Sequence, residues 1–86
     1  MQRKHSLQIA FGLAIRKRRE KVGISQEELA ARAGLHRTYV SDVERGERNI
    51  SLMNIGKLAV ALHTSLSSLF KSLPNHQMPS RDEGHK

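Results

Sequence analysis

The sequence predicts an all-α fold, a compact domain of five helices. Apolar residues recur at spacings of three and four in consecutive segments, which is the period of a helix buried on one face. Serines stand where helices would begin, and glycines stand where they would end. No segment shows the alternation typical of a strand. The 86 residues, 37% of them hydrophobic, suffice for one modest core and are too few for two.

The first predicted helix begins near Leu7 and ends near Gly23. Its apolar face is marked by Leu7, Phe11, Ala14, Ile15 and Val22. Its other face is basic, because residues 1–21 contain seven Lys and Arg against one acidic residue, Glu20. Such a cluster is either a solvated helix face or a surface for a polyanion, and the pattern alone leaves both interpretations open.

A second, short helix is predicted to begin at Gln26. Ser25 followed by Glu28 is a capping-box pattern, in which the serine hydroxyl accepts the backbone N–H of Glu28 while the carboxylate reaches back. Gly34 suits the left-handed conformation that ends many helices. Up to this glycine the helix carries its apolar residues on the inner side: Leu29, Ala30 and Ala33.

Three more helices are expected after this turn. The third carries Val40 and Val43 toward the core and ends at Gly46. Ser51 caps the fourth, whose apolar residues keep helical spacing: Leu52, Ile55, Leu58, Ala59 and Leu62. Pro74 helps to end the fifth, which is marked by Leu66, Leu69, Phe70 and Leu73.

We divide the chain into a flexible N-terminus (1–6), a single domain (7–73) and a disordered tail (74–86). The tail is polar and has no apolar period, so it offers too little apolar surface to fold by itself. All candidate functional residues therefore belong to the one domain.

Composition and charge limit the function. The chain contains no cysteine, which excludes a disulfide framework, a thiol nucleophile and thiolate metal ligands. Fifteen Lys and Arg against eight Asp and Glu give a formal net charge of +7, which favours a polyanionic partner. The longest nearly apolar run, residues 9–15, is far shorter than the roughly 20 residues that span a bilayer, and no signal-peptide pattern occurs. We therefore expect a cytoplasmic protein that does not bind a membrane.

The histidines do not indicate an enzyme or a metal site. The five are scattered along the chain, and none stands at metal-ligand spacing from another. No nucleophile motif or glycine-rich phosphate loop occurs. We expect no catalytic residue, no metal and no cofactor.

Two short helices joined by a tight turn at Gly34 predict a helix-turn-helix, in which one helix crosses a DNA backbone and the next enters the major groove. The pattern is carried by residues 23–52, GISQEELAARAGLHRTYVSDVERGERNISL. On these residues the chain resembles the Cro and phage-repressor type (XRE-like) helix-turn-helix regulators, which have a lambda-repressor-like fold. Within that family, residues 36–51 are similar to the small controller proteins of bacterial restriction-modification operons. The resemblance implies a sequence-specific transcriptional regulator that binds double-stranded DNA.

The third helix would then read the bases. Arg37 stands near its start, where a guanidinium can contact guanine O6 and N7, with a phosphate contact as the alternative. Thr38, Ser41 and Asp42 share its outward face. Thr38 suits a thymine methyl group, and Ser41 suits a base or a phosphate. Asp42 either accepts from cytosine N4 or holds Arg37 in place. The second role is favoured, since an unpaired carboxylate beside phosphates is unfavourable.

The resemblance implies further DNA contacts next to this face. Gln26, beside the capping Ser25, would bind a phosphate at the positive end of the second helix. The hydroxyl of Tyr39 would reach a phosphate, with packing at the edge of the core as the alternative. His36 occupies a position where the family often has a capping Ser or Thr, so the third helix lacks a hydroxyl cap and the imidazole is left as a candidate contact.

The resemblance also assigns roles outside the recognition helix. Arg19 and Glu44 match a partly buried ion pair that ties the first helix to the end of the third. Arg48 and Asn49 lie in the loop where backbone contacts of the family cluster, so we expect them to bind phosphate. Arg18 stands where the family commonly has leucine. Its stem is expected to cover apolar surface while its charge stays in water, or else the core is thinner there.

The fifth helix predicts a homodimer. Leu66, Leu69, Phe70 and Leu73 exceed what one small core needs, although closure of the monomer's own core is the alternative. We expect two recognition helices about 34 Å apart on a pseudo-palindromic site. A rival function is an antitoxin or adaptor that uses the same fold to bind a protein. A protein partner is not visible from the sequence, and the short polar tail disfavours this function.

Overall fold

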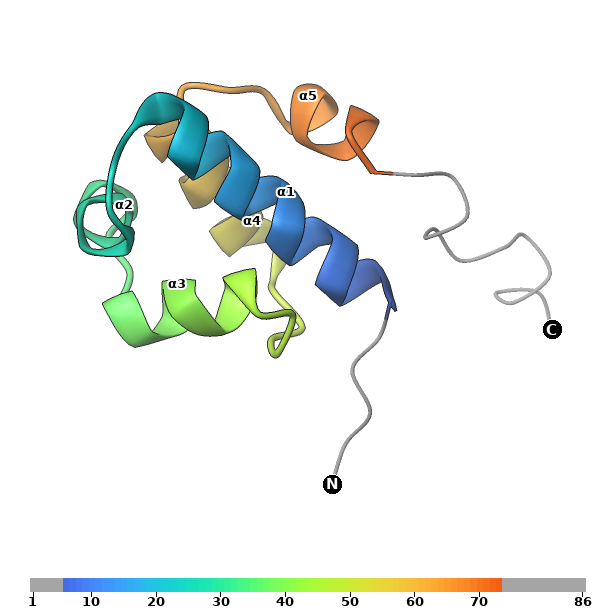
Figure 1. The fold of residues 1–86 in the computed structure, drawn as a ribbon, viewed down its shortest axis with the longest axis horizontal. Helices are drawn as coiled ribbons and strands as arrows, with labels where there is room; N and C mark the ends of the chain where they lie inside the picture. Colours follow the sequence, from blue (N-terminus) through green and yellow to red (C-terminus); the bar gives the residue numbers. More distant parts are fainter. Residues whose placement is uncertain (1–5, 74–86) are drawn as a thin grey trace, which may run out of the picture.

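The computed structural model describes residues 6–73, and the expectations for residues 1–5 and 74–86 lie outside this range. Five helices and no strand occur in it, which confirms the all-α prediction (Figure 1). They are α1 (Ser6–Val22), α2 (Gln26–Ala33), α3 (Arg37–Glu44), α4 (Leu52–Ala61) and α5 (Leu66–Lys71). Ser6, which we had placed in the flexible N-terminus, is the first residue of α1.

Three helices begin at the serine side chains that their sequences offer. The hydroxyl of Ser25 accepts the backbone N–H of Glu28 at 3.0 Å, and the same bond begins α4 at Ser51 and α5 at Ser65. Each bond satisfies one N–H group of the first turn, which has no partner inside the helix. Only half of the predicted capping box forms, because the carboxylate of Glu28 pairs with Arg32 at 3.0 Å.

Left-handed residues end α2 and α4. Gly34 has φ +70° at the end of α2, and the next N–H, of Leu35, donates to the carbonyl of Ala30 at 2.9 Å. The end of α4 has the same bond pattern around His63, with φ +54°. His63 is the single residue other than glycine with positive φ between residues 6 and 73. Glycine adopts this conformation without the steric cost that a Cβ imposes.

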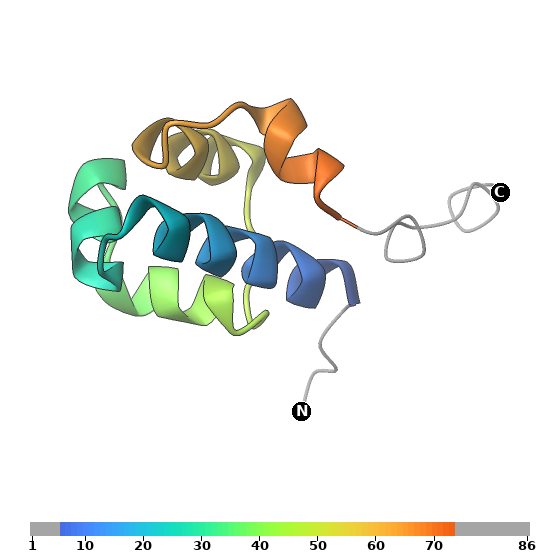
Figure 2. The ribbon, with the colours of Figure 1, turned by 45° about the horizontal axis from the view of Figure 1, so that its top comes forward.

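The helices surround one core. Figures 1 and 2 show α2 at one end of α1 and α5 near the other end. In Figure 2, α3 and α4 run on opposite sides of α1. Helix α3 packs against α1 and α2, α4 packs against α2, and α5 contacts both α1 and α4. The buried cluster consists of Phe11, Ile15, Leu29, Ala30, Ala33, Val40, Val43, Leu58, Ala59, Ala61, Leu62 and Leu69.

The structure divides the apolar residues of α5, which we had assigned together to a dimer interface. Leu69 and Leu73 are buried in the monomer, at 4% and 6% exposure. Leu66 and Phe70 keep 40% and 38% exposure, and the Phe70 ring stacks on Phe11 with the centroids 5.9 Å apart. The alternative, that α5 closes the core of the monomer, is therefore confirmed for Leu69 and Leu73. Of these four residues, Leu66 and part of Phe70 remain exposed for an interface.

One expectation about the core was wrong. Leu52 has helical spacing with the buried residues of α4, yet it is exposed. Arg18 is half-buried, and its guanidinium binds two carbonyl groups: its Nε donates to the carbonyl of Leu62 at 3.0 Å, and its Nη2, which stays exposed, donates to that of His63 at 2.9 Å. Arg18 therefore satisfies carbonyl groups at the end of α4 that have no partner within the helix.

Candidate nucleic-acid interface

Helices α2 and α3 meet through a short turn, and their packing holds one face of α3 outward. Val40 and Val43 are buried beneath α3, whereas Arg37 and Thr38 lie exposed on its first turn. The buried residues of α2 are Leu29, Ala30 and Ala33. The two alanines are small, so they allow a neighbouring helix to approach closely. The local sequence thus gives α3 one side for packing and another for contacts with a ligand.

An ion pair fixes the end of α3 on α1. Arg19 Nε lies 2.6 Å from Glu44 Oε2, and Arg19 Nη2 donates to Glu44 Oε1 at 3.0 Å. Arg19 also donates to the carbonyl of Ile24 at 2.9 Å. Such a two-pronged pair has defined geometry because the guanidinium and the carboxylate are both planar. The contact sets the direction of α3 relative to α1.

Glu44 is the buried acid of the described core, and its carboxylate has a third donor. Gln26 Nε2 donates to Glu44 Oε1 at 2.9 Å. The first residue of α2 is therefore bound to the last residue of α3. The hydrogen bond with Glu44 raises the pKa of Arg19 above its ordinary value, while burial of the guanidinium acts in the opposite direction. The guanidinium of Arg19 therefore stays charged near neutral pH.

The first turn of α3 carries side chains without intramolecular partners. Arg37 and Thr38 are exposed and make no side-chain hydrogen bond or ion pair within residues 6–73. His36 is the N-cap residue in extended conformation, and its side chain makes no capping bond. These three side chains lie together at the start of the helix, where the N–H groups also lack partners.

The last turn of α3 is different, because its charges are paired with one another. Asp42 accepts hydrogen bonds from Arg45 and, at 3.3 Å, from Arg48 Nε. Arg45 also donates to the hydroxyl of Ser41. We had expected Asp42 to hold Arg37, and that expectation was wrong. Asp42 pairs with Arg45 and Arg48 and not with Arg37. Arg45 lies one helical turn away from Asp42, which is the spacing of neighbouring side chains on a helix.

Tyr39 connects α3 to the following loop and to α4. Its hydroxyl accepts a hydrogen bond from Asn54 Nδ2 at 3.0 Å, and the guanidinium of Arg48 lies 5.0 Å from its ring centroid. Its ring is half-buried at the edge of the core. The packing alternative is therefore confirmed for the ring, and the phosphate contact stays a prediction, for which the hydroxyl keeps a hydrogen that it can donate.

Residues 15–69 match the helix-turn-helix family. The chain is 43% identical over 70 residues to the control protein C.MunI of Mycoplasma sp, covering 80% of this chain and 95% of that protein. It is 49% identical over 59 residues to the control protein C.BamHI of Bacillus amyloliquefaciens, covering 67% of this chain and 73% of that protein. The chain belongs to the helix-turn-helix family.

This helix-turn-helix protein is also similar to a solved controller protein. The restriction-modification controller protein C.AhdI from Aeromonas hydrophila has a TM-score of 0.72 and 51% identity, covering 73% of this chain and 96% of that one. The resemblance to XRE-like regulators and controller proteins is confirmed. The protein is a DNA-binding transcriptional regulator of the controller-protein type, and its family is not one of enzymes.

Two residues of this helix-turn-helix protein belong with the candidate interface although we did not predict them from the sequence. Arg45 pairs with Asp42, and Asn54 donates to Tyr39. The spacing of three residues between Asp42 and Arg45 on a helix was a usable signal. For Asn54 no local signal exists, because α4 is separated from Tyr39 by a loop and meets it only in the folded chain.

Residues 6–73 contain neither a grouped set of metal ligands nor a membrane-spanning helix. No three His, Asp or Glu side chains in this range are grouped so that they could hold a metal ion. None of the described helices has the length and apolar character to cross a membrane.

Proposed function

We propose that this helix-turn-helix protein recognises a specific double-stranded DNA sequence with α3 in the major groove, and that it binds a pseudo-palindromic operator as a homodimer. One observation carries the proposal: Arg37 and Thr38 are exposed without partners, while the charges one to two turns further along α3 are paired. Side chains at the start of a recognition helix contact base edges. Arg37 is placed to reach guanine O6 and N7, and Thr38 to contact a thymine methyl group.

The surrounding residues suit contacts with the DNA backbone. Ser25 and Gln26 stand at the N-terminus of α2, where the helix dipole favours a phosphate. The bond between Gln26 and Glu44 holds that side chain between α2 and α3 while leaving its carbonyl group available. Arg48 and Asn49 are exposed in the loop after α3, and Arg48 stacks on Tyr39. Phosphate contacts would fix the register in which α3 reads the bases.

Other residues of α3 take supporting roles in the proposal. The imidazole of His36 points from the N-cap position and has no competing capping bond. Ser41 and Asp42 are tied to Arg45, so they position that arginine beside the DNA rather than reading bases alone. Asp42 is neutralised by two arginines, which removes the repulsion that an unpaired carboxylate would meet near phosphates.

We propose that two copies associate through α5, with Leu66 and the exposed part of Phe70 at the contact. A single small module gives a modest interface with DNA, so two copies on one site supply the affinity and specificity that one lacks. The relatives named control proteins and the controller protein C.AhdI support a role in controlling a restriction-modification operon.

The test is selection from a pool of random duplex DNA with the wild type and Arg37→Ala. We expect a palindromic sequence from the wild type and a loss of preference at one position per half-site with the variant. The expected loss is about 1–3 kcal/mol, or about five- to 150-fold. Arg37→Lys serves as the control, since it keeps the charge but not the bidentate geometry.

The outcomes separate base reading from phosphate binding. If Arg37→Ala weakens binding equally on all sequences, Arg37 contacts a phosphate and the base assignment is wrong. If the wild type enriches no sequence and its binding disappears steeply with salt, the protein is not a sequence-specific regulator. A protein partner would then be the next hypothesis.

The homodimer is tested by the mass of the protein in solution. Leu66→Glu places a charge at the proposed contact and is expected to shift the dimer toward monomer. Leu13→Glu on the exposed side of α1 is the matched control, because Leu13 is similarly exposed and lies on another helix. A dimer that persists in Leu66→Glu removes α5 from the interface.

A further inference from the structure

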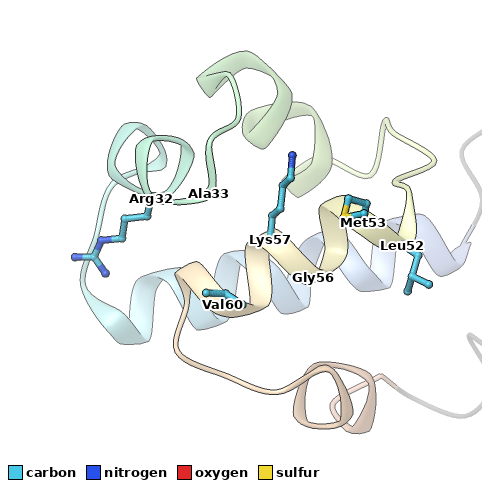
Figure 3. A pocket seen from close by; sticks show the side chains of 7 residues that line it. All are labelled: Arg32, Ala33, Leu52, Met53, Gly56, Lys57 and Val60. Atoms are coloured by element: carbon cyan, nitrogen blue, oxygen red, sulfur yellow. The ribbon is translucent and has the colours of Figure 1, made fainter.

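A broad apolar groove lies between α4 and the end of α2. It has a volume of about 540 Å³ and is lined by apolar atoms of Leu52, Met53, Gly56 and Val60 from α4, with Ala33 from α2. Figure 3 shows these α4 residues following one another along the helix. Met53, Gly56, Lys57 and Val60 have the spacings of three and four that place residues on one face. None of the lining residues belongs to the proposed DNA contacts.

The apolar side chains of this groove are unusually exposed. Leu52, Met53 and Val60 have 73%, 71% and 76% of their surface in water, the three highest values among the large apolar residues of the described range. Gly56 stands between them with no atom within 4 Å of the place where a Cβ would be. A cluster of exposed apolar residues around the open space at Gly56 is typical of an interaction site. An amphipathic helix fits such a groove through its own apolar stripe.

The charges at the rim indicate the chemistry of the partner. Lys57 and Arg32 are the charged residues of the lining, and no acidic residue lines the groove. Lys57 makes no hydrogen bond or ion pair within residues 6–73, whereas Arg32 is paired with Glu28 on the surface of α2. In Figure 3 the Lys57 side chain extends from α4 toward the side of α3.

The charges of the lining residues also argue against a second copy of the chain in this groove. Across a two-fold axis at Gly56, each Lys57 would approach its own counterpart, and the lining offers no carboxylate to compensate. Opposite charge in the partner removes this repulsion.

We propose that the α4 groove, defined by Leu52, Met53, Gly56, Lys57 and Val60, binds an acidic amphipathic helix of another protein. Apolar residues of that helix pack on Met53 and Val60, with its backbone close to Gly56. Carboxylates beside its apolar stripe pair with Lys57. Because the groove shares no residue with the proposed DNA contacts, the partner and DNA can bind the same molecule.

The test uses two synthetic peptides about three turns long, each stapled as a helix. Both carry leucines at positions i, i+3, i+4 and i+7, and one has glutamates beside the leucines where the other has lysines. Binding to the full chain is measured by fluorescence anisotropy, and the site by amide shifts in NMR spectra. The protein variants are Val60→Glu, Lys57→Glu and, as the control on another helix, Leu13→Glu.

We expect saturable binding of the acidic peptide with amide shifts along α4. The basic peptide should bind about fivefold or more weakly, and Lys57→Glu should reverse this preference. Val60→Glu should weaken the acidic peptide about tenfold, because it buries a charge against leucine. Leu13→Glu should leave binding unchanged. Circular dichroism verifies that each variant is folded, as expected for substitutions at exposed positions.

Three results would overturn the proposal. Equal binding of both peptides, or of neither, excludes an acidic partner. A dimer of the wild type that Val60→Glu dissociates shows that a second copy covers the groove. Weaker binding of DNA by Lys57→Glu, with the peptide preference unchanged, assigns Lys57 to the DNA interface instead. The first of these leaves the proposed reading of DNA by Arg37 intact, since Arg37 is tested by sequence selection alone.

Discussion

Arg19 and Glu44 join α1 to the end of α3 by two hydrogen bonds, with 2.6 Å between Arg19 Nε and Glu44 Oε2. The two residues are 25 positions apart in the chain. Glu44 is buried and Arg19 nearly so, which makes this contact different from the exposed pairs of the surface. This contact fixes the end of α3 on α1.

Loss of one member of this pair should cost more than loss of both. Arg19→Met leaves a buried carboxylate with Gln26 as its remaining side-chain donor, so we expect the free energy of unfolding to fall by about 3–5 kcal/mol. Arg19→Met with Glu44→Leu should recover part of that loss. Urea denaturation measures both. Equal losses in the single and double variants would mean that the buried charge is not the cause.

The pKa of Arg19 predicts how this pair responds to pH. The hydrogen bond to Glu44 raises the pKa of Arg19 in the folded state. A raised pKa means that the stabilisation is complete below the unfolded value and is lost only as pH rises through the folded value. Titration of Arg19 should therefore not alter stability near neutral pH, and a dependence there would have another source.

Gly12 and Gly56 should respond oppositely to alanine. A Cβ on Gly12 would overlap the backbone oxygens of Val43 and Glu44, with 2.8 Å to the latter, so Gly12→Ala must push α1 away from α3. We expect a loss of about 1–3 kcal/mol. Gly56 has open space at its Cβ position, so Gly56→Ala should add about 0.5–1 kcal/mol through helix propensity. Thermal unfolding compares the two variants. A destabilised Gly56→Ala would contradict the open groove.

Replacing His63 with glycine should stabilise the protein. It has φ +54° at the end of α4, a conformation that strains a residue with a Cβ. His63→Gly is therefore expected to raise the free energy of unfolding by about 0.5–1 kcal/mol. Gly34→Ala at the corresponding position of α2, with φ +70°, should lower it by a similar amount. No gain in His63→Gly would indicate that the imidazole makes a compensating contribution.

Asp42 should limit non-specific binding to DNA. It pairs with Arg45 and Arg48, so Asp42→Asn releases positive charge beside the proposed backbone contacts. We expect tighter binding to a non-cognate duplex and a salt dependence whose slope steepens by about one unit for each additional phosphate contact. The measurement is affinity against salt concentration. Ser25→Ala is unsuitable as a control because it removes a helix cap, whereas Glu20→Gln changes charge on α1 without touching α3.

Local signals in the sequence predicted where the helices begin and end. Ser25, Ser51 and Gly34 act through bonds to residues within one or two turns, so their effect can be read from neighbours in the chain. Apolar spacing located the buried valines of α3 for the same reason. The family resemblance rested on these local signals together, and the comparisons confirmed it.

The tertiary structure alone decided which side chains remain available. Leu66 and Leu69 are both leucines of α5, but only Leu69 packs into the buried core cluster, whereas Leu66 stays 40% exposed. Arg18 reaches the carbonyls that end α4, 44 and 45 positions away, which no local pattern indicates. The partner of Asp42 also depends on the folded chain, because Arg48 reaches its carboxylate from beyond the end of α3. Arg37 does not pair with Asp42 and stays exposed. Helical spacing specifies a face, and packing between distant helices specifies whether that face is covered, paired or open.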